Sequence, residues 1–183
     1  MKKASMLAGV IVFVAASALI VCAQTQVFVP GNASGLFGGA ADALVPLVPA
    51  LTLTGPGTIT VTYVSGTVTD GAAGEIGPGG TVWNIGTNQA PLQESQSIAG
   101  GKIKNFNALI GVFVPAARVS HAGFTPVDGT KDATRVGIMP GRLFFIGQGK
   151  TFEAKEPGTL FLGINDYAVN DNGGGFNVEV TAQ

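Results

Sequence analysis

Short runs of alternating residues, separated by glycine and proline clusters, most constrain the fold of this chain. In residues 58–64, threonines alternate with isoleucine, tyrosine and valines. Such alternation is typical of a β-strand with one buried face. Further short strand candidates are residues 107–114, 142–146, 151–154, 159–164 and 176–180, and Gly, Pro, Asn and Asp clusters lie between them. Several short strands separated by turn residues predict an all-β sandwich or barrel.

Helical periodicity is weak after the first residues. Residues 40–51 are the one candidate helix, but Pro46 and Pro49 interrupt them, and proline breaks a helix interior. Residues 31–50 are rich in Gly, Ala, Leu and Pro and poor in charge, so we expect an irregular arm that packs over the sandwich rather than a polar linker. No internal repeat or second domain is visible.

The amino end has the three parts of a secretory leader. Lys2 and Lys3 precede an apolar or small stretch over residues 6–23, and polar residues follow. We therefore predict a signal peptide over residues 1–23, cleaved after Ala23, and a single domain over residues 24–183. An uncleaved membrane anchor is the alternative. Acylation of Cys22 is a weaker one, because Val21 is bulky where a small residue is wanted.

The predicted export and the net charge of the mature chain indicate where the protein acts and argue against some classes of partner. We expect a bacterial protein that is secreted, periplasmic or held at the cell surface, with no membrane contact once the leader is removed. The chain has 10 basic and 11 acidic residues, and loss of two leader lysines gives a mature net charge near −3. That charge argues against a nucleic-acid partner, which needs a basic face. The single cysteine, Cys22, lies in the predicted leader, so we expect the mature domain to be stabilised by its core, with a metal as a further source of stability.

Catalytic motifs are scarce. The one histidine, His121, lies in a loop-like segment, where a solvated side chain is the usual finding, and no Gly-x-Ser-x-Gly elbow is present. One histidine without a mature cysteine cannot form the usual zinc shell. Asp166 and Asp171 could be a glycosidase pair, but they lie among three asparagines. We therefore expect a protein that is not an enzyme, with hydrolase as a distant alternative.

The loop over residues 165–172 is the strongest functional signal. It contains Asn165, Asp166, Asn170, Asp171 and Asn172, all with hard oxygen donors of the kind that calcium prefers. Three glycines over residues 173–175 then allow a tight return into the next strand. The spacing is not that of an EF-hand. A hairpin connection stabilised by Asx turns is the alternative explanation.

Several segments resemble the calcium-dependent, galactose-binding bacterial lectins of the PA-I type and their exported relatives. Residues 158–166 followed by residues 171–176 resemble the closing segment of that family. The upstream segments 57–61, 65–66, 77–80, 90–93 and 107–111 follow the family's order. The resemblance covers residues 57–180, which is most of the mature chain.

The resemblance implies a jelly-roll β-sandwich similar to galactose-binding domains, with a calcium at one edge that binds two sugar hydroxyls. By position, Asp166 is implied to supply carboxylate oxygens, and Asp171 and Asn172 are implied to supply side-chain oxygens. Val169 and Asp70 are implied to supply backbone carbonyls. The loop up to Asp171 is two residues shorter than in the lectins, and Asp171 replaces an amide there, which adds negative charge favourable to a cation.

The sugar side of the implied site differs from the family. Pro91 and Gln93 match the loop that borders the sugar, but Ala90 stands where the lectins have a sugar-contacting histidine. Trp83, the only tryptophan, fits a semi-buried strand position, and an exposed indole that stacks on a sugar is the alternative. Galactose is therefore not the expected ligand on sequence grounds alone.

The sequence thus predicts an exported, calcium-dependent protein that binds a carbohydrate or glycoconjugate. The alternative, from another class, is a structural surface or matrix module in which calcium only rigidifies the loop. Association of several copies of the chain is left open.

Overall fold

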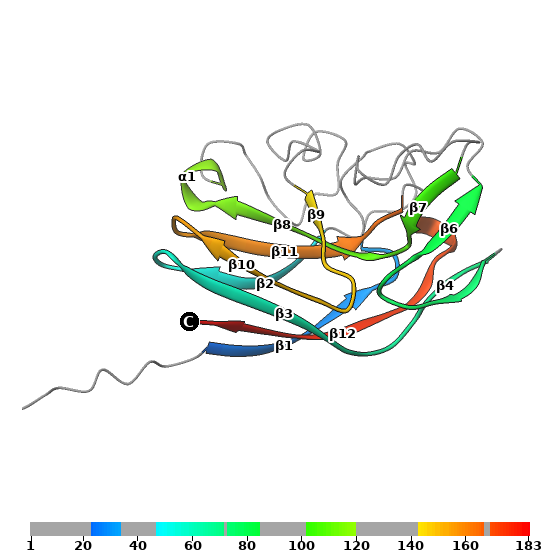
Figure 1. The fold of residues 1–183 in the computed structure, drawn as a ribbon, viewed down its shortest axis with the longest axis horizontal. Helices are drawn as coiled ribbons and strands as arrows, with labels where there is room; N and C mark the ends of the chain where they lie inside the picture. The colour runs from blue at the N-terminus through cyan, green and yellow to red at the C-terminus, as the bar shows by residue number, and fades with distance from the viewer. Residues whose placement is uncertain (1–22, 34–46, 72, 85–101, 120–142, 167–168) are drawn as a thin grey trace, which may run out of the picture.

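The computed structural model describes residues 23–33, 47–71, 73–84, 102–119, 143–166 and 169–183. Nearly all regular structure in these ranges is β (Figure 1). The strands are β1 (Ala23–Pro30), β2 (Val48–Leu53), β3 (Gly57–Ser65), β4 (Val68–Asp70), β5 (Gly74–Ile76), β6 (Thr81–Asn84), β7 (Lys102–Phe106), β8 (Leu109–Pro115), β9 (Leu143–Phe145), β10 (Gly149–Ala154), β11 (Gly158–Ile164) and β12 (Gly173–Ala182). One helical turn, α1 (Ala116–Val119), follows β8, and a 3₁₀ turn, η3 (Val169–Asp171), precedes β12.

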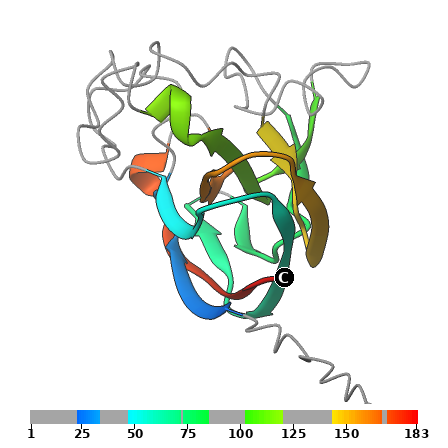
Figure 2. The ribbon, with the colours of Figure 1, turned by 90° about the vertical axis from the view of Figure 1, so that its left-hand side faces the viewer.

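Two antiparallel sheets form the layers of a β-sandwich. The first has the order β10-β3-β12-β4-β5, with β1 also paired to β12, and the second has the order β2-β11-β8-β9. Strands β6 and β7 form a separate pair. Seen from its left-hand side, the fold has its sheets curving around a common interior (Figure 2). The expectation of an all-β sandwich is therefore confirmed.

The main core lies between the two large sheets. Ile59 and Val61 of β3 and Val178 and Val180 of β12 are at most 1% exposed, and they face Leu160 and other buried residues of the second sheet. Thr60 and Thr62, which alternate with Ile59 and Val61 on β3, lie outside this core, so the alternation in the sequence reflects one buried face. Apolar burial of this kind is the main stabilising contribution to the fold.

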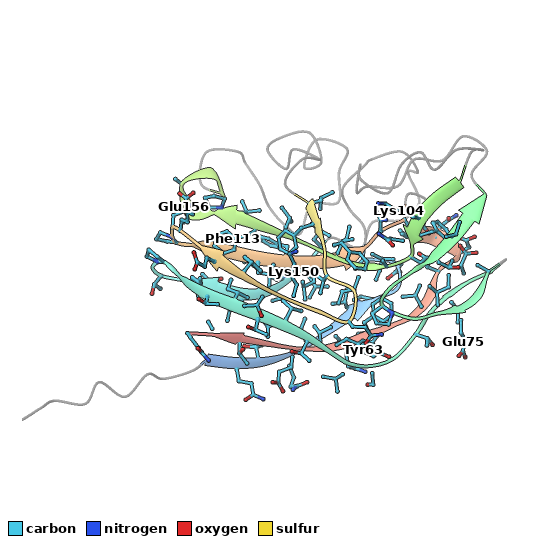
Figure 3. All side chains as sticks on the ribbon, in the orientation of Figure 1. Tyr63, Glu75, Lys104, Phe113, Lys150 and Glu156 are labelled. Atoms are coloured by element: carbon cyan, nitrogen blue, oxygen red, sulfur yellow. The ribbon has the colours of Figure 1, made fainter. Side chains whose placement is uncertain are left out.

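Strand β8 does not alternate, because residues on both of its faces are buried. Leu109 belongs to the main core, whereas Ile110, Val112 and Val114 pack with Leu143 and others in a smaller cluster. A near-continuous apolar sequence is typical of a strand covered on two sides. Two residues labelled in Figure 3 take part in aromatic contacts: Phe113 contacts Phe152, and Lys150 Nζ lies 5.6 Å from the centre of the Phe144 ring.

The predicted strands are present with shifted ends. The run at residues 107–114 becomes β8 only from Leu109 onward, and the run at 176–180 extends back to Gly173, through the glycines expected in a loop. Strands β1, β2, β4, β5 and β7 were not predicted. Val48–Leu53 (β2) overlaps the arm predicted for residues 31–50, so that prediction is wrong for the last three residues of the arm.

Two predicted regions include residues that the structure does not describe. Residues 1–22 of the predicted leader are not described, and Ala23 is the first residue of β1, where it pairs with Ala182. Most of the predicted arm, residues 34–46, also lies outside the described residues. In the described parts of the chain, no helix has the length and apolar character to cross a membrane.

The two ends of the sandwich differ in what they contain. At one end, Thr58 and the last residue, Gln183, exchange two backbone hydrogen bonds, close to the start of β1. Glu156 and α1 also lie at this end (Figure 3). At the other end lie β4, β5, β6 and β7, with Glu75 and Lys104 (Figure 3). That second end, called the β4–β7 end below, holds the candidate site.

Candidate cation site

Four parts of the chain that are distant in the sequence meet at the β4–β7 end. Gly31 directly follows β1, Asp70 ends β4, and Asn107 lies between β7 and β8. Asp166 lies two residues beyond β11, and Asn172 separates η3 from β12. Asn107, Asp166 and Asp70 are 0%, 3% and 7% exposed. Burial of this many polar groups in one place is unusual, because each needs a partner that replaces water.

A chain of hydrogen bonds links these residues. The Asn107 Nδ2 group donates to Asp70 Oδ2 at 3.3 Å. The Asn172 Nδ2 group donates to Asn107 Oδ1 at 3.0 Å, to Asp166 Oδ2 at 3.0 Å and to the Gly31 carbonyl at 3.1 Å. We call these four side chains and the Gly31 carbonyl the amide–carboxylate cluster. Two carboxylates are thus joined through two amides.

The backbone around Asn107 explains why an asparagine stands there. Asn105 and Asn107 have φ values of 55° and 58°, a left-handed conformation that asparagine tolerates better than most residues. The Asn165 amide donates to the Asn105 carbonyl at 2.8 Å, and the Asn107 N–H donates to the Asn165 carbonyl at 3.1 Å. The left-handed turn therefore anchors the β7–β8 connection to the end of β11, so Asn107 lies near Asp166.

The glycine run beside Asn172 brings three strands together. Gly174 has a φ of 68°, and a Cβ there would meet the Thr67 carbonyl at 2.3 Å. A Cβ on Gly31 would meet the Gly173 carbonyl at 2.4 Å. The start of β12 pairs with β4 through Gly173 and Gly174 and with β1 through Gly175. This close approach, which only glycine allows, brings the Gly31 carbonyl within reach of Asn172 and places the end of β4 beside the start of β12.

Asn172 has a buried polar atom without a hydrogen-bond partner among the described residues. Its Nδ2 has two protons and faces three oxygen acceptors. Its Oδ1 is buried and accepts no hydrogen bond in the described part of the chain. A buried carbonyl oxygen without a donor costs free energy. Three oxygens therefore surround Asn172 Nδ2, while Oδ1 of the same carboxamide has no donor among the described residues.

The predicted metal ligands are only partly brought together. Asp166 and Asn172 lie in the cluster, and Asp70 lies there through its side chain. The backbone carbonyls predicted as ligands are engaged in turns: Asp70 O accepts from Ala73 N at 3.2 Å, and Val169 O accepts from Asn172 N at 3.3 Å. Asp171 is exposed, and none of the hydrogen bonds found among the described residues joins it to the cluster.

The predicted sugar contacts and two other residues cannot be placed. Pro91, Gln93, Ala90 and His121 lie outside the described residues. Trp83 is in strand β6, as expected, opposite Ile103 of β7.

The donor set fits a hard cation. All acceptor atoms of the cluster are carboxylate, carboxamide or backbone carbonyl oxygens, the ligands that calcium takes. No group of three histidine, cysteine or acidic side chains suited to a metal occurs in the described ranges. A cation here would therefore depend on amide and carbonyl oxygens in addition to Asp166, not on an acidic cluster.

Asn107 and Gly31 were missed by the sequence reasoning. Asn107 appeared only as the first residue of an expected strand, and Gly31 as the start of an arm. The Asn-x-Asn spacing of Asn105 and Asn107 is a weak turn signal that could have moved Asn107 out of the strand. Nothing in the sequence connects Gly31 with residue 172, because their proximity depends on the pairing of β1 with β12.

Comparison with known proteins adds no family assignment to this geometry. No protein-family model matches the chain, and no curated protein matches it significantly. The resemblance to PA-I-type lectins rests on the sequence segments described above.

Proposed function

We propose that the protein binds carbohydrate through a calcium ion held at the amide–carboxylate cluster. The convergence of oxygen donors on Asn172 carries this proposal. Three oxygens, from Gly31, Asn107 and Asp166, lie within 3.1 Å of one amide nitrogen. Calcium bound there would balance the carboxylate charge and order the segment from Asp166 to Asn172, and its remaining coordination positions are suited to vicinal sugar hydroxyls.

The sequence resemblance supports the sugar part of the proposal. It implies a jelly-roll variant of the sandwich, with a calcium at one edge, and the cluster lies at an edge. It also assigns the sugar-bordering loop to Pro91 and Gln93. The chain's small charge and lack of catalytic motifs agree with a binding protein rather than an enzyme.

A specific observation favours the structural alternative. Asp166 is 3% exposed and Asn107 is 0% exposed, so an ion beside them is enclosed by protein on several sides. An enclosed ion serves to rigidify the end of the sandwich. A sugar-binding ion must instead have at least two positions open to solvent.

A glycan array with and without chelator separates these functions. Lectin function predicts binding that calcium restores and chelator removes, while the fold persists in both states. Gln93→Ala should change sugar affinity or preference and leave calcium affinity unchanged, whereas Asp166→Asn should remove both. A calcium-loaded protein that binds no glycan on a broad array would favour the structural module. Binding that survives chelator would contradict the calcium-bridged mechanism.

The proposed location is outside the cytoplasm of a bacterium. Lys2, Lys3 and the apolar residues that follow support it. Mass spectrometry of natively exported protein should find Gln24, or a close neighbour, at the amino end. Recovery of residues 1–23 with the membrane fraction would support an uncleaved anchor instead.

A further inference from the structure

At Asn172, the amide nitrogen faces three oxygens while the amide oxygen has no donor among the described residues, and rotation of the carboxamide can exchange the two atoms. A carboxamide has nearly the same shape at both ends, so a half turn about its last torsion exchanges Oδ1 and Nδ2 with little movement elsewhere. After such a turn, Oδ1 would take the present place of Nδ2, about 3 Å from Asn107 Oδ1, Asp166 Oδ2 and the Gly31 carbonyl.

Without a cation this turn is unfavourable. It breaks three hydrogen bonds and places four oxygen atoms together with no proton between them. With calcium the same arrangement is favourable. Calcium holds oxygens at about 2.3 to 2.6 Å, and adjacent ligands in a pentagonal bipyramid are therefore about 2.8 to 3.5 Å apart. The separations of 3.0, 3.0 and 3.1 Å around Asn172 lie within that range.

We propose that the Asn172 carboxamide is a cation-dependent switch: its N–H group holds the cluster together without the ion, and a half turn presents Oδ1 as a ligand when calcium binds. This inference rests on the proposed calcium site and deepens it. Asn107 and Gly31 then supply further ligand oxygens, neither of which the sequence resemblance implies. The buried Oδ1 of Asn172, which has no donor in the ion-free state, is the oxygen held in reserve for the ion.

Asp70 keeps Asn107 in the orientation that the switch needs. Because Asn107 Nδ2 donates to Asp70 Oδ2, Asn107 Oδ1 is directed toward Asn172. Groups that orient a ligand in this way commonly affect metal affinity without touching the ion. Asp70 is therefore a positioning residue.

Substitution of Asn172 by aspartate tests the switch, because its effect has opposite signs in the two states. Without calcium, Asn172→Asp removes the N–H donor and sets a carboxylate against three oxygens, so Tm should fall by about 5 °C or more. With calcium, the new carboxylate supplies a charged ligand, and affinity should rise by about tenfold over the parent. Asn172→Ala should lower calcium affinity by tenfold or more.

A matched control lies at an exposed position of β12, the strand that directly follows Asn172. Asn177 is exposed and donates to Ser65 Oγ at 3.1 Å, so Asn177→Asp makes the same chemical change outside the cluster. It should leave both calcium affinity and Tm close to those of the parent. If Asn177→Asp also tightened binding tenfold, a general charge effect would replace the switch.

The outcomes distinguish the switch from the calcium site itself. Parent protein that binds no calcium in a calorimetric titration overturns the site, and the switch with it. Parent protein that binds calcium, with Asn172→Asp as weak as Asn172→Ala, overturns only the switch. If Asn172→Asp does not fold without calcium, NMR of the parent decides. Calcium should shift the Asn172 side-chain NH₂ signals as they lose their acceptors, and unchanged signals in the calcium-saturated protein would contradict the turn.

Discussion

Ile59 and Val61 in the main core are 0% and 1% exposed, and Asn107 and Asp166 at the β4–β7 end are 0% and 3% exposed. Equal burial has different physical consequences in the two places. The core gains free energy by removing apolar surface from water. The cluster loses the hydration of two carboxylates and two side-chain amides, and only well-placed partners compensate for that loss. The core should therefore be stable without ligand, whereas the stability of the cluster should depend on calcium.

Truncation in the core should have the largest effect on stability and no dependence on calcium. Ile59→Ala removes a fully buried side chain and should cost about 2 to 5 kcal/mol of unfolding free energy. Denaturant unfolding with calcium and with chelator should give the same loss. Val64→Ala, on an exposed position of the same strand, should change stability by less than about 0.5 kcal/mol. If calcium largely restored the unfolding free energy lost in Ile59→Ala, the proposed difference between the core and the cluster would be wrong.

Truncation in the cluster should remove the calcium dependence. Asp166→Ala deletes a charged oxygen and one acceptor of the Asn172 amide, so calcium should no longer raise Tm. For the parent, calcium at about 100 times its Kd should add about 2.7 kcal/mol of stability. In chelator, Asp166→Ala should cost about 1 to 3 kcal/mol through the lost hydrogen bond. A calcium affinity equal to that of the parent would remove Asp166 from the site.

Asp171 should matter less than the sequence resemblance implies. Its side chain is exposed, so Asp171→Ala should keep calcium binding and change unfolding free energy by less than about 0.5 kcal/mol. Titration of calcium into Asp166→Ala and Asp171→Ala side by side measures the difference. Equal loss in both variants would show that the ligand set implied by the resemblance, and not the cluster, holds the ion.

Of these changes, reducing agent should have the smallest effect on the stability of both the core and the cluster. The chain has one cysteine, so no disulfide can form within it. A thermal scan with and without a thiol reagent should give the same Tm in calcium and in chelator. A lower Tm under reducing conditions would require a covalent link between chains.

The sequence was sufficient for the parts of the fold that depend on local pattern. The alternation at residues 58–64 predicts β3 because one face of that strand is buried. Strands β4 and β5 have three residues each, too few for a period of two to be recognised. The glycines at the start of β12 were expected in a loop, because glycine is common in turns. They are part of a strand instead, and glycine is needed there because the neighbouring strands lie too close for a Cβ.

The candidate site, like the fold, could be predicted only where it depends on local sequence pattern. Asp166 and Asn172 could be predicted, since they lie six residues apart in one loop of oxygen donors. The place of Asp70 in that site came from the resemblance, and its side-chain contact with Asn107 joins residues 37 positions apart. Gly31 and Asn172 are 141 positions apart. Such contacts follow from strand pairing and from a left-handed turn, and neither can be read from local composition.

A crystal structure of the protein grown in millimolar calcium would show directly whether the cluster holds the ion. We predict an ion about 2.3 to 2.6 Å from Asp166 Oδ2, Asn107 Oδ1 and the Gly31 carbonyl, with an atom of the Asn172 carboxamide in the same shell. An ion coordinated by Asp171 and not by Asn107, or a cluster that still has the Asn172 amide hydrogen-bonded to all three oxygens at saturating calcium, would contradict it.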